Sequence, residues 1–171
     1  MTQQDYPEIW DLFTKEGHPT GKILARGKQI PQGLYHRIVS VIVQHEDGEF
    51  LVMQRDTHKR GFPGKYELSA GGSVLKDETV FVAAQRELKE ETGIQCEFWI
   101  KLSEHLRENY PGICTTYYCR TNIDKSDIQL QTGETMSYQW LSSEEVETWI
   151  AQGKIVFLTL AGFIELQQLI H

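Results

Sequence analysis

The feature that most constrains this chain is a group of three glutamates near the end of one predicted helix. The segment 78–92 has helical periodicity and is followed by Gly93. Glu87, Glu90 and Glu91 stand at i, i+3 and i+4, so their carboxylates share one face, at the negative end of the helix dipole. A solvated acidic face would carry a penalty of about 1–2 kcal/mol. A bound Mg²⁺ or Mn²⁺ would offset that penalty, because hard divalent cations prefer carboxylate oxygens.

The segments around this helix read mainly as strands. Residues 8–30 predict an N-terminal hairpin, because glycine and proline separate two short apolar runs. Further strand-like runs are 37–44, 49–55, 95–102, 105–109, 113–120 and 137–141. Asp47-Gly48 predicts a two-residue hairpin turn that returns 49–55 as the partner of 37–44. Asp77 is the expected N-cap of the central helix, and two more helices are expected over 146–152 and 157–170. The order predicts a mixed α+β (α/β-type) fold with helices packed on a sheet.

Size and charge limit the classes of function. The 171 residues, of which 40% are hydrophobic, predict a single domain over 1–171. The net charge of −7 disfavours binding to a nucleic acid polymer. We expect no membrane segment, and a cytoplasmic location, because no apolar run is long enough and the N-terminus lacks a signal core. The three cysteines suggest neither a disulfide framework nor a zinc site.

The central helix belongs to a longer motif over residues 72–94, which reads G-x5-E-x7-R-E-L-x-E-E-x-G-I. This pattern resembles the Nudix box in every defined position. The resemblance implies the Nudix fold, a mixed sheet sandwiched between helices, with glutamates that bind Mg²⁺. It implies metal ligation by Glu87, Glu91 and the Gly72 carbonyl, and a role for Glu90 as ligand or general base. The structural residues of the motif would be Glu78, Arg86 and Gly93, where Gly93 supplies the positive φ that ends the helix.

Within the motif, Arg86 has an expected partner. We predict that Arg86 pairs with Glu78 and fixes the loop on the helix, and that it points away from the adjacent Glu87.

Two further groups of residues outside the motif are candidates for binding or catalysis. Four basic residues gather between Met53 and Gly71, where they would meet substrate phosphates or form a solvated loop: Arg55, Lys59, Arg60 and Lys65. Glu134 precedes a predicted strand, at a place from which Nudix proteins often contribute a further acidic residue. Glu134 and Glu90 are both candidate general bases, and an exposed turn carboxylate is the alternative for Glu134.

From about residue 8 to about residue 165, the chain also resembles the branch of Nudix proteins similar to isopentenyl-diphosphate isomerase, through EIWDLFTKEGHPTGK, GLYHR, LVMQR and HKRGFPGK. An isomerase of that kind needs a cysteine soon after Phe62-Pro63-Gly64, and KYELSAGG follows instead. We therefore expect Mg²⁺-dependent hydrolysis of a diphosphate bond in a nucleoside diphosphate derivative or a nucleoside di- or triphosphate. The alternatives are an isomerase and a non-catalytic protein that binds a nucleotide or sugar phosphate.

The expected partner of the protein is a small phosphorylated substrate. The apolar hairpin with Trp10 and Phe13 is a candidate homodimer contact.

Overall fold

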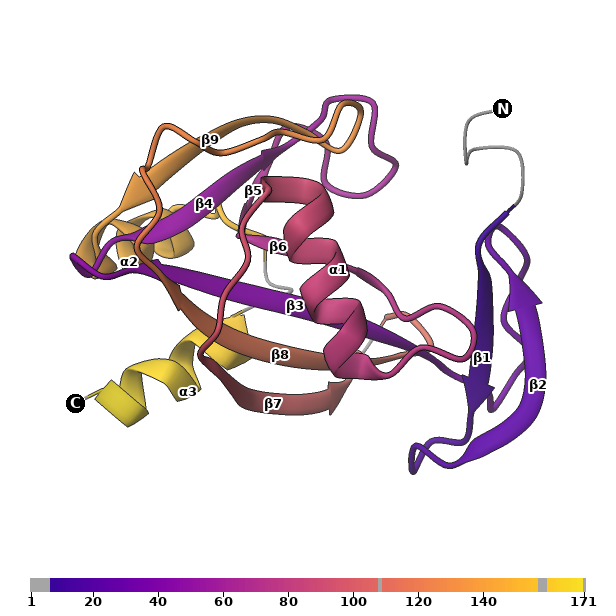
Figure 1. Cartoon of the computed structure of the whole chain (residues 1–171). Helices are drawn as coiled ribbons and strands as arrows, with labels where there is room; N and C mark the ends of the chain where they lie inside the picture. The colour runs from indigo at the N-terminus through magenta and orange to yellow at the C-terminus, as the bar shows by residue number, and fades with distance from the viewer. Residues whose placement is uncertain (1–6, 108, 157–159, 171) are drawn as a thin grey trace.

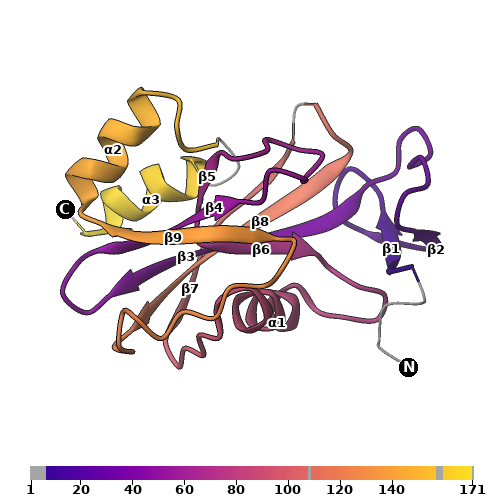
Figure 2. The same cartoon turned by 90° about the horizontal axis from the view of Figure 1, so that it is seen from above.

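The computed structural model describes residues 7–107, 109–156 and 160–170. The elements in chain order are β1 (Ile9–Phe13), β2 (Pro19–Ala25), β3 (His36–His45), β4 (Phe50–Arg55), β5 (Tyr66–Leu68), β6 (Ala70–Ser73), α1 (Val80–Thr92), β7 (Trp99–Leu106), β8 (Gly112–Thr121), β9 (Thr135–Leu141), α2 (Ser143–Ala151) and α3 (Leu160–Ile170). A mixed sheet lies between α1 on one face and α2 with α3 on the other, and the β1–β2 hairpin stands at one end (Figures 1 and 2). The predicted fold class and the N-terminal hairpin are confirmed.

The sheet is organised around β3. In the described part of the chain seven strands form it, in the order β5-β4-β3-β8-β7, with β6 paired to β3 and β9 paired to β4. The β3–β8 pair is parallel and runs from His36↔Gly112 to His45↔Thr121, whereas the other pairs are antiparallel. Because β6 lies beside β3 and leads into α1, the residues that precede α1 sit at the centre of the sheet.

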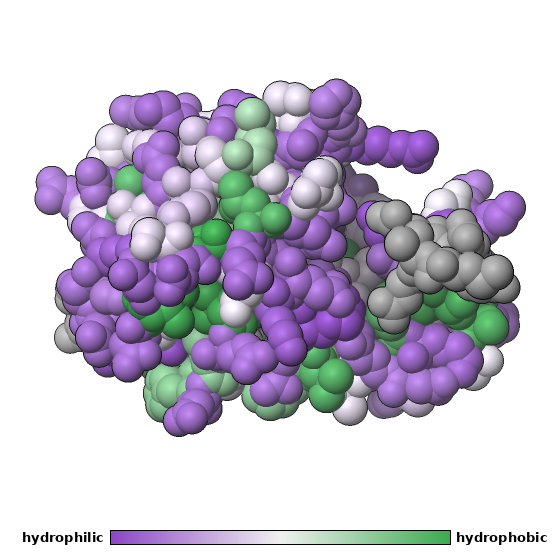
Figure 3. Space-filling model, turned by 45° about the horizontal axis from the view of Figure 1, so that its top comes forward, coloured by the Kyte–Doolittle hydropathy of each residue, from purple (hydrophilic) through white to green (hydrophobic). Residues whose placement is uncertain are grey.

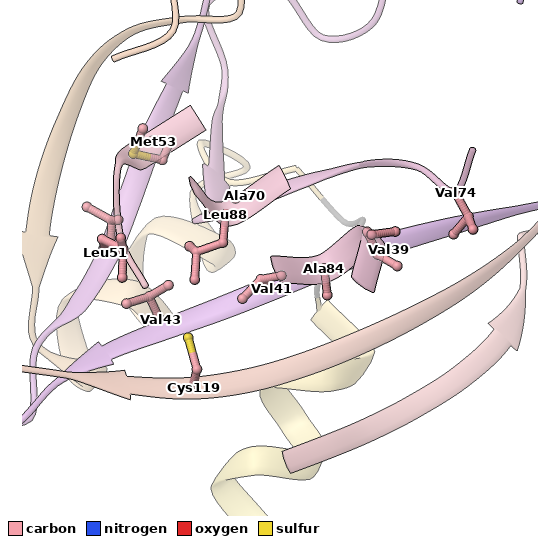
Figure 4. Close-up of a cluster of buried hydrophobic side chains, with 12 residues drawn as sticks. Val39, Val41, Val43, Leu51, Met53, Ala70, Val74, Ala84, Leu88 and Cys119 are labelled. Atoms are coloured by element: carbon pink, nitrogen blue, oxygen red, sulfur yellow. The ribbon is translucent and has the colours of Figure 1, made fainter. Parts of the chain in front are cut away.

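Alternate residues of β3 and β4 supply two cores, one on each face of the sheet. Val39, Val41 and Val43 point toward α1 together with Leu51 and Met53 (Figure 4). Leu88 and Ala84 of α1 close this core, which includes Cys119 on β8. The opposite core contains Ile42, Phe50 and Val52 and is covered by Val146 of α2 and by Phe163 and Leu166 of α3. Strand alternation and helix periodicity therefore explain which face each helix covers.

A tight turn forms at Asp47-Gly48, although its loop has three residues, 46–48, where two were predicted, and β4 does not stay beside β3. The His45 N–H donates to the Glu49 carbonyl at 2.8 Å, and Gly48 has a φ of 100°. The only β3–β4 partners in the described ladder are Gln44 and Phe50. Beyond them β6 takes the edge of β3, while β4 pairs with β5 and β9. The hairpin prediction was therefore right for the position of the turn and wrong for its length and for most of the pairing.

Ser69 fills the gap where β4 leaves β3. Its hydroxyl accepts a hydrogen bond from the Val43 N–H at 2.9 Å and donates one to the Leu51 carbonyl at 2.9 Å. The residue is fully buried and has a φ of 63°, as the chain passes from β5 to β6. One side chain thus replaces the ladder hydrogen bonds that the diverging strands cannot make.

Other boundaries also differ from the sequence predictions. Thr79, rather than Asp77, caps α1, and its side chain accepts from the Val82 N–H at 3.2 Å. The predicted strands 95–102 and 105–109 are replaced by a single strand, β7, and the short strands β5 and β6 lie in a stretch that was expected to be a loop. The final predicted helix begins at Leu160 in the structure, and residues 157–159 lie outside the described ranges.

Hydrophilic residues cover most of the face in Figure 3, and apolar residues there form small separate groups. No helix within the described ranges has the length and apolar character that crossing a membrane requires.

Replacement of Ser69 by alanine tests its bridging role. Ser69→Ala should lower the free energy of unfolding by about 2–4 kcal/mol, because two buried backbone groups lose their hydrogen-bond partner. Ser103→Ala is the matched control, since the buried Ser103 hydroxyl has no partner among the described residues, and it should change stability by less than about 0.5 kcal/mol. Urea denaturation measures both variants, and equal losses would contradict the bridging role.

Candidate active site

The acidic helix α1 is bounded by local signals at both ends. Thr79 caps its start, and Gly93 ends it in the left-handed conformation with a φ of 76°. The Gly93 N–H donates to the Lys89 carbonyl at 2.9 Å. Because no intrahelical partner exists for the last carbonyls, this cap fixes the turn that carries Glu90 and Glu91.

Two glycines bring the backbone of β6 against this helix. A Cβ atom on Gly72 would lie 2.2 Å from Glu87 Oε1, and one on Gly71 would lie 2.5 Å from the Val39 carbonyl oxygen. A side chain at position 71 would clash with the β3 backbone, and one at position 72 would displace the Glu87 side chain, so the two glycines let the β6 backbone lie close to this carboxylate. The Gly72 backbone and the Glu87 side chain therefore face each other directly.

Arg86 joins the loop before α1 to the acidic face of α1. Its guanidinium donates to both carboxylate oxygens of Glu78, at 2.8 and 3.0 Å, and to the Ser73 carbonyl at 3.0 Å. It also donates to Glu87 at 2.8 Å and contacts Glu90 at 3.3 Å. The expected pairing with Glu78 is present. The expectation that Arg86 points away from Glu87 was wrong, because the long side chain folds back along α1 and reaches both neighbours.

The pKa values of these groups follow their surroundings. Burial alone would raise the pKa of Glu78, but hydrogen bonds from Arg86 and from the Leu75 N–H hold that pKa below its usual value. Burial raises the pKa of Glu87, although Arg86 opposes the shift. The arginine thus keeps a structural carboxylate charged and partly neutralises a second one.

The Glu91 carboxylate has an unfavourable electrostatic environment. Glu91 is only 5% exposed, and its carboxylate accepts a hydrogen bond from the Gly71 N–H at 3.2 Å. Burial raises its pKa well above the usual value, and the carboxylates of Glu67 and Glu87 raise it further. A buried carboxylate beside two others is stable as an anion only when positive charge compensates it.

The three glutamates of α1 line a cavity of about 410 Å³. The other predicted site residues in its lining are Gly72, Arg55, Lys59, Arg86 and Glu134. The structure does not bring Arg60 and Lys65 to this cavity: Arg60 is exposed, and Lys65 donates to the Gly153 carbonyl at 3.1 Å. The basic loop therefore divides into two residues that face the cavity and two that do not.

The two cavity-facing basic residues are each held by a carboxylate. Arg55 donates from Nη1 to both oxygens of Glu67, at 3.0 and 2.9 Å. Lys59 forms an ion pair with Glu134, and burial together with the nearby Arg55 lowers its pKa. Both basic residues and both of their carboxylate partners line the same cavity as the acidic face of α1.

Sequence reasoning missed Glu67, which lines the cavity from β5. Burial raises its pKa, and Arg55 opposes the shift. In a strand, a charged residue between Tyr66 and Leu68 would be a weak indication of a site residue. That indication was missed because the stretch was interpreted as a loop.

Sequence reasoning also missed the end of the cavity beside the N-terminal hairpin. Trp10, His36, Arg107 and Tyr110 line this end. The ring of His36 stacks on Trp10 with centroids 4.2 Å apart and meets Tyr110 edge-on at 5.2 Å. Burial, with the charge of Arg107, lowers the pKa of His36 to about 4. Trp10, a candidate dimer contact from the sequence, is instead packed within the chain and is only 6% exposed.

Comparison with known proteins agrees with this geometry. The model of the NUDIX domain matches residues 34–160. The chain belongs to the Nudix family. An uncharacterised Nudix hydrolase of Listeria monocytogenes is 32% identical over 152 residues, which cover 87% of this chain and 88% of the relative.

Solved Nudix structures share the fold. DR0079 from Deinococcus radiodurans aligns with a TM-score of 0.74 at 22% identity and covers 90% of this chain and 95% of its own. The Nudix domain of Shewanella oneidensis NrtR, complexed with ADP ribose, aligns with a TM-score of 0.64 at 17% identity and covers 80% of this chain and 89% of its own. At these identities the likeness shows the fold alone.

Nudix hydrolases generally use divalent metal ions, and the donors in this Nudix chain fit such an ion chemically. Glu87, Glu90 and Glu91 offer hard oxygen atoms, and the crowding of Glu91 against other carboxylates is the kind that a cation relieves. Within the described ranges, no group of three or more Asp, Glu, His or Cys side chains is already arranged to hold a metal ion. Arg86 contacts Glu87 and Glu90, so these carboxylates are balanced by the arginine in this arrangement.

Glutamine variants of Glu78 and Glu91 test whether the Glu78 carboxylate stabilises the fold and the buried Glu91 carboxylate destabilises it. In the absence of metal, Glu78→Gln should lower the free energy of unfolding by about 1–2 kcal/mol, because charged hydrogen bonds to Arg86 are lost. Glu91→Gln should leave it unchanged or raise it, since an uncompensated buried charge is removed. Denaturation in a chelator measures both, with the exposed Glu97→Gln as control. A larger loss for Glu91→Gln than for Glu78→Gln would refute the division.

Proposed function

We propose that the protein hydrolyses a diphosphate bond in a nucleoside diphosphate derivative or a nucleoside di- or triphosphate, with Mg²⁺ as its ion and Mn²⁺ as a substitute. One observation carries this proposal: the acidic face of α1 and two basic side chains, Arg55 and Lys59, line the same cavity. A diphosphate with its cation needs both signs of charge within reach.

We assign Glu87, Glu90, Glu91 and the Gly72 carbonyl as the groups that would hold the ion. The bound ion would neutralise charge on phosphate oxygens and make water a stronger acid. The close approach of Gly72 to Glu87 supports this set, because it puts a backbone beside the carboxylate without a side chain between them. Glu78 and Arg86 act by position, since they tie the loop to the helix.

Arg55 and Lys59 are the proposed phosphate-binding residues of the cavity. The contacts of Nη1 with both Glu67 oxygens, and the hydrogen bond from Nε to the Gly61 carbonyl at 2.9 Å, orient Arg55, so its Nη2 donors are preorganised. Lys59 is paired with Glu134, and an incoming phosphate would compete for the same ammonium group. Substrate binding would therefore release the Glu134 carboxylate next to the reacting phosphate.

Of the two candidate bases, we favour Glu134. It comes from the turn before β9, outside the α1 glutamate set proposed to hold the ion. The hydrogen bond from the Asp56 N–H to the Glu134 carbonyl at 2.9 Å fixes its backbone beside the basic loop. Its side chain is partly exposed, so it can receive a proton from water and pass it to solvent.

The two alternatives have less support. An isomerase with a cysteine nucleophile is disfavoured because Cys96, Cys114 and Cys119 are all absent from the cavity lining in the described chain. A non-catalytic binding protein would need the cavity but not a set of glutamates that crowd one another. The Nudix domain of NrtR, which has this fold, has been solved in complex with ADP ribose, which is why binding without cleavage is kept as an alternative.

A screen for phosphate-bond cleavage tests the proposal. The protein should release phosphorylated products from nucleoside diphosphate derivatives or triphosphates with Mg²⁺, and chelation should abolish turnover. Glu91→Gln should lower kcat by about 10²–10⁴-fold, while Glu78→Gln should lower it less because the ion site is loosened and not emptied. Binding without cleavage across the panel would favour the binding protein, and isomerisation of isopentenyl diphosphate would favour the isomerase.

A pair of glutamine variants tests the choice of base. Glu134→Gln should lower kcat by about 10²–10⁴-fold with the Mg²⁺ requirement unchanged, and should remove the acidic limb of the pH–rate profile. Glu90→Gln should instead raise the Mg²⁺ concentration needed for half-maximal rate. The exposed Glu97→Gln is the control. If Glu90→Gln removes the acidic limb and Glu134→Gln retains it, Glu90 is the base.

A further inference from the structure

The hairpin end of the cavity holds buried polar groups that the proposed chemistry does not use. We call it the hairpin-end pocket and define it by Trp10, His36, Arg107 and Tyr110. His36 is 2% exposed and Trp10 is 6% exposed, yet both line the cavity. Within the described part of the chain, neither ring nitrogen of His36 nor the Trp10 indole N–H has a hydrogen-bond partner. Buried polar groups are nearly always paired, so these point to a ligand.

The rings of Trp10, His36 and Tyr110 pack against one another. His36 is stacked on Trp10 and faces the edge of Tyr110, and its backbone N–H donates to the Pro111 carbonyl at 3.1 Å. His36 opens β3 opposite Gly112, the first residue of β8, so the central parallel strand pair fixes its position. Strand pairing and ring stacking therefore hold His36 in place. The unpaired nitrogens have almost no accessible surface in this arrangement, so a ligand would reach them through a small shift of the neighbouring side chains.

The groups of the pocket favour an anion rich in oxygen. The Arg107 guanidinium lies over the Tyr110 ring at 5.3 Å and adds a positive charge. The indole N–H and the imidazole N–H are further donors. Arg26 and Glu8 at the rim form an ion pair at 2.8 Å, so they leave the net charge unaltered. Because His36 is held neutral, one ring nitrogen remains an acceptor, which suits an oxyanion that also carries a hydroxyl.

We propose that the hairpin-end pocket binds a phosphate monoester of the substrate, separate from the diphosphate that is cleaved. This inference rests on the proposed function and narrows it, because it selects nucleoside diphosphate derivatives with a second phosphoryl group. A phosphate monoester has several oxygen acceptors for Trp10, His36 and Arg107, and its protonated form donates one hydrogen bond. An apolar or purely aromatic group would leave the buried nitrogens unpaired.

Matched substrate pairs test the proposal. NADPH and NADH differ by one phosphate monoester, as do coenzyme A and its 3′-dephospho form, and each molecule contains a diphosphate bond. With Mg²⁺, the phosphorylated member of at least one pair should have a KM lower by about tenfold or more. Arg107→Gln and Trp10→Phe should reduce this KM ratio to about one. Arg120→Gln, an exposed arginine outside the cavity, should leave the ratio unchanged.

A binding measurement separates failure of this inference from failure of the proposed function. Calorimetry with the same pairs in the absence of metal should show tighter binding of the phosphorylated member. If that preference is found but no member is cleaved with Mg²⁺, the hydrolase proposal is overturned and the phosphate-monoester site stands. Equal affinity and equal KM within both pairs would overturn the phosphate-monoester site. Inorganic phosphate should shift the ring-nitrogen NMR signals of His36. Such a shift without any preference within the pairs would assign the pocket to free phosphate and overturn its role in substrate selection.

Discussion

The half-buried guanidinium of Arg86 makes the interactions on which the rest of the site depends. It fixes Glu78 and the Ser73 carbonyl, which belong to the segment before α1, and it reaches Glu87 and Glu90 on α1 itself. Burial would lower the pKa of an arginine, but the adjacent carboxylates of Glu78 and Glu87 raise that of Arg86. A permanent cation at this point keeps the loop and the acidic face of the helix together while carboxylates crowd around it.

The carboxylates can lie this close together because the fold fixes the backbone positions of β6 and α1. Glycines in β6 let the loop lie against Glu87, and the β3 strand beneath them is fixed by ten parallel partners in β8. On the far side of the cavity, Glu67 and Glu134 hold Arg55 and Lys59. The result is a polar cavity in which carboxylates of α1 and basic side chains of β4 and the following loop are held by fixed partners, which is the arrangement that preorganised catalysis requires.

Much of this was present in local sequence patterns. The spacing of Glu87, Glu90 and Glu91 placed them on one face of a helix, and the αL propensity of glycine placed the helix end at Gly93. The tight turn at Asp47-Gly48 and the buried β3 strand followed from similarly local rules. Predictions failed where several residues compete for one role. Thr79 rather than Asp77 became the cap, and Arg60 and Lys65 of the basic loop turned away from the cavity.

The sequence by itself determined the helix with its acidic face, the glycines around it and membership of an α+β class, because each depends on residues within a few positions of one another. Only the tertiary structure decided that β4 leaves β3, that Ser69 bridges the gap, and that Glu67 and His36 line the cavity with α1. Those facts depend on contacts between distant segments, such as His36 of β3 with Trp10 of the hairpin and Tyr110 before β8. Burial and the absence of a partner are properties of a packed three-dimensional environment, and no local pattern encodes them.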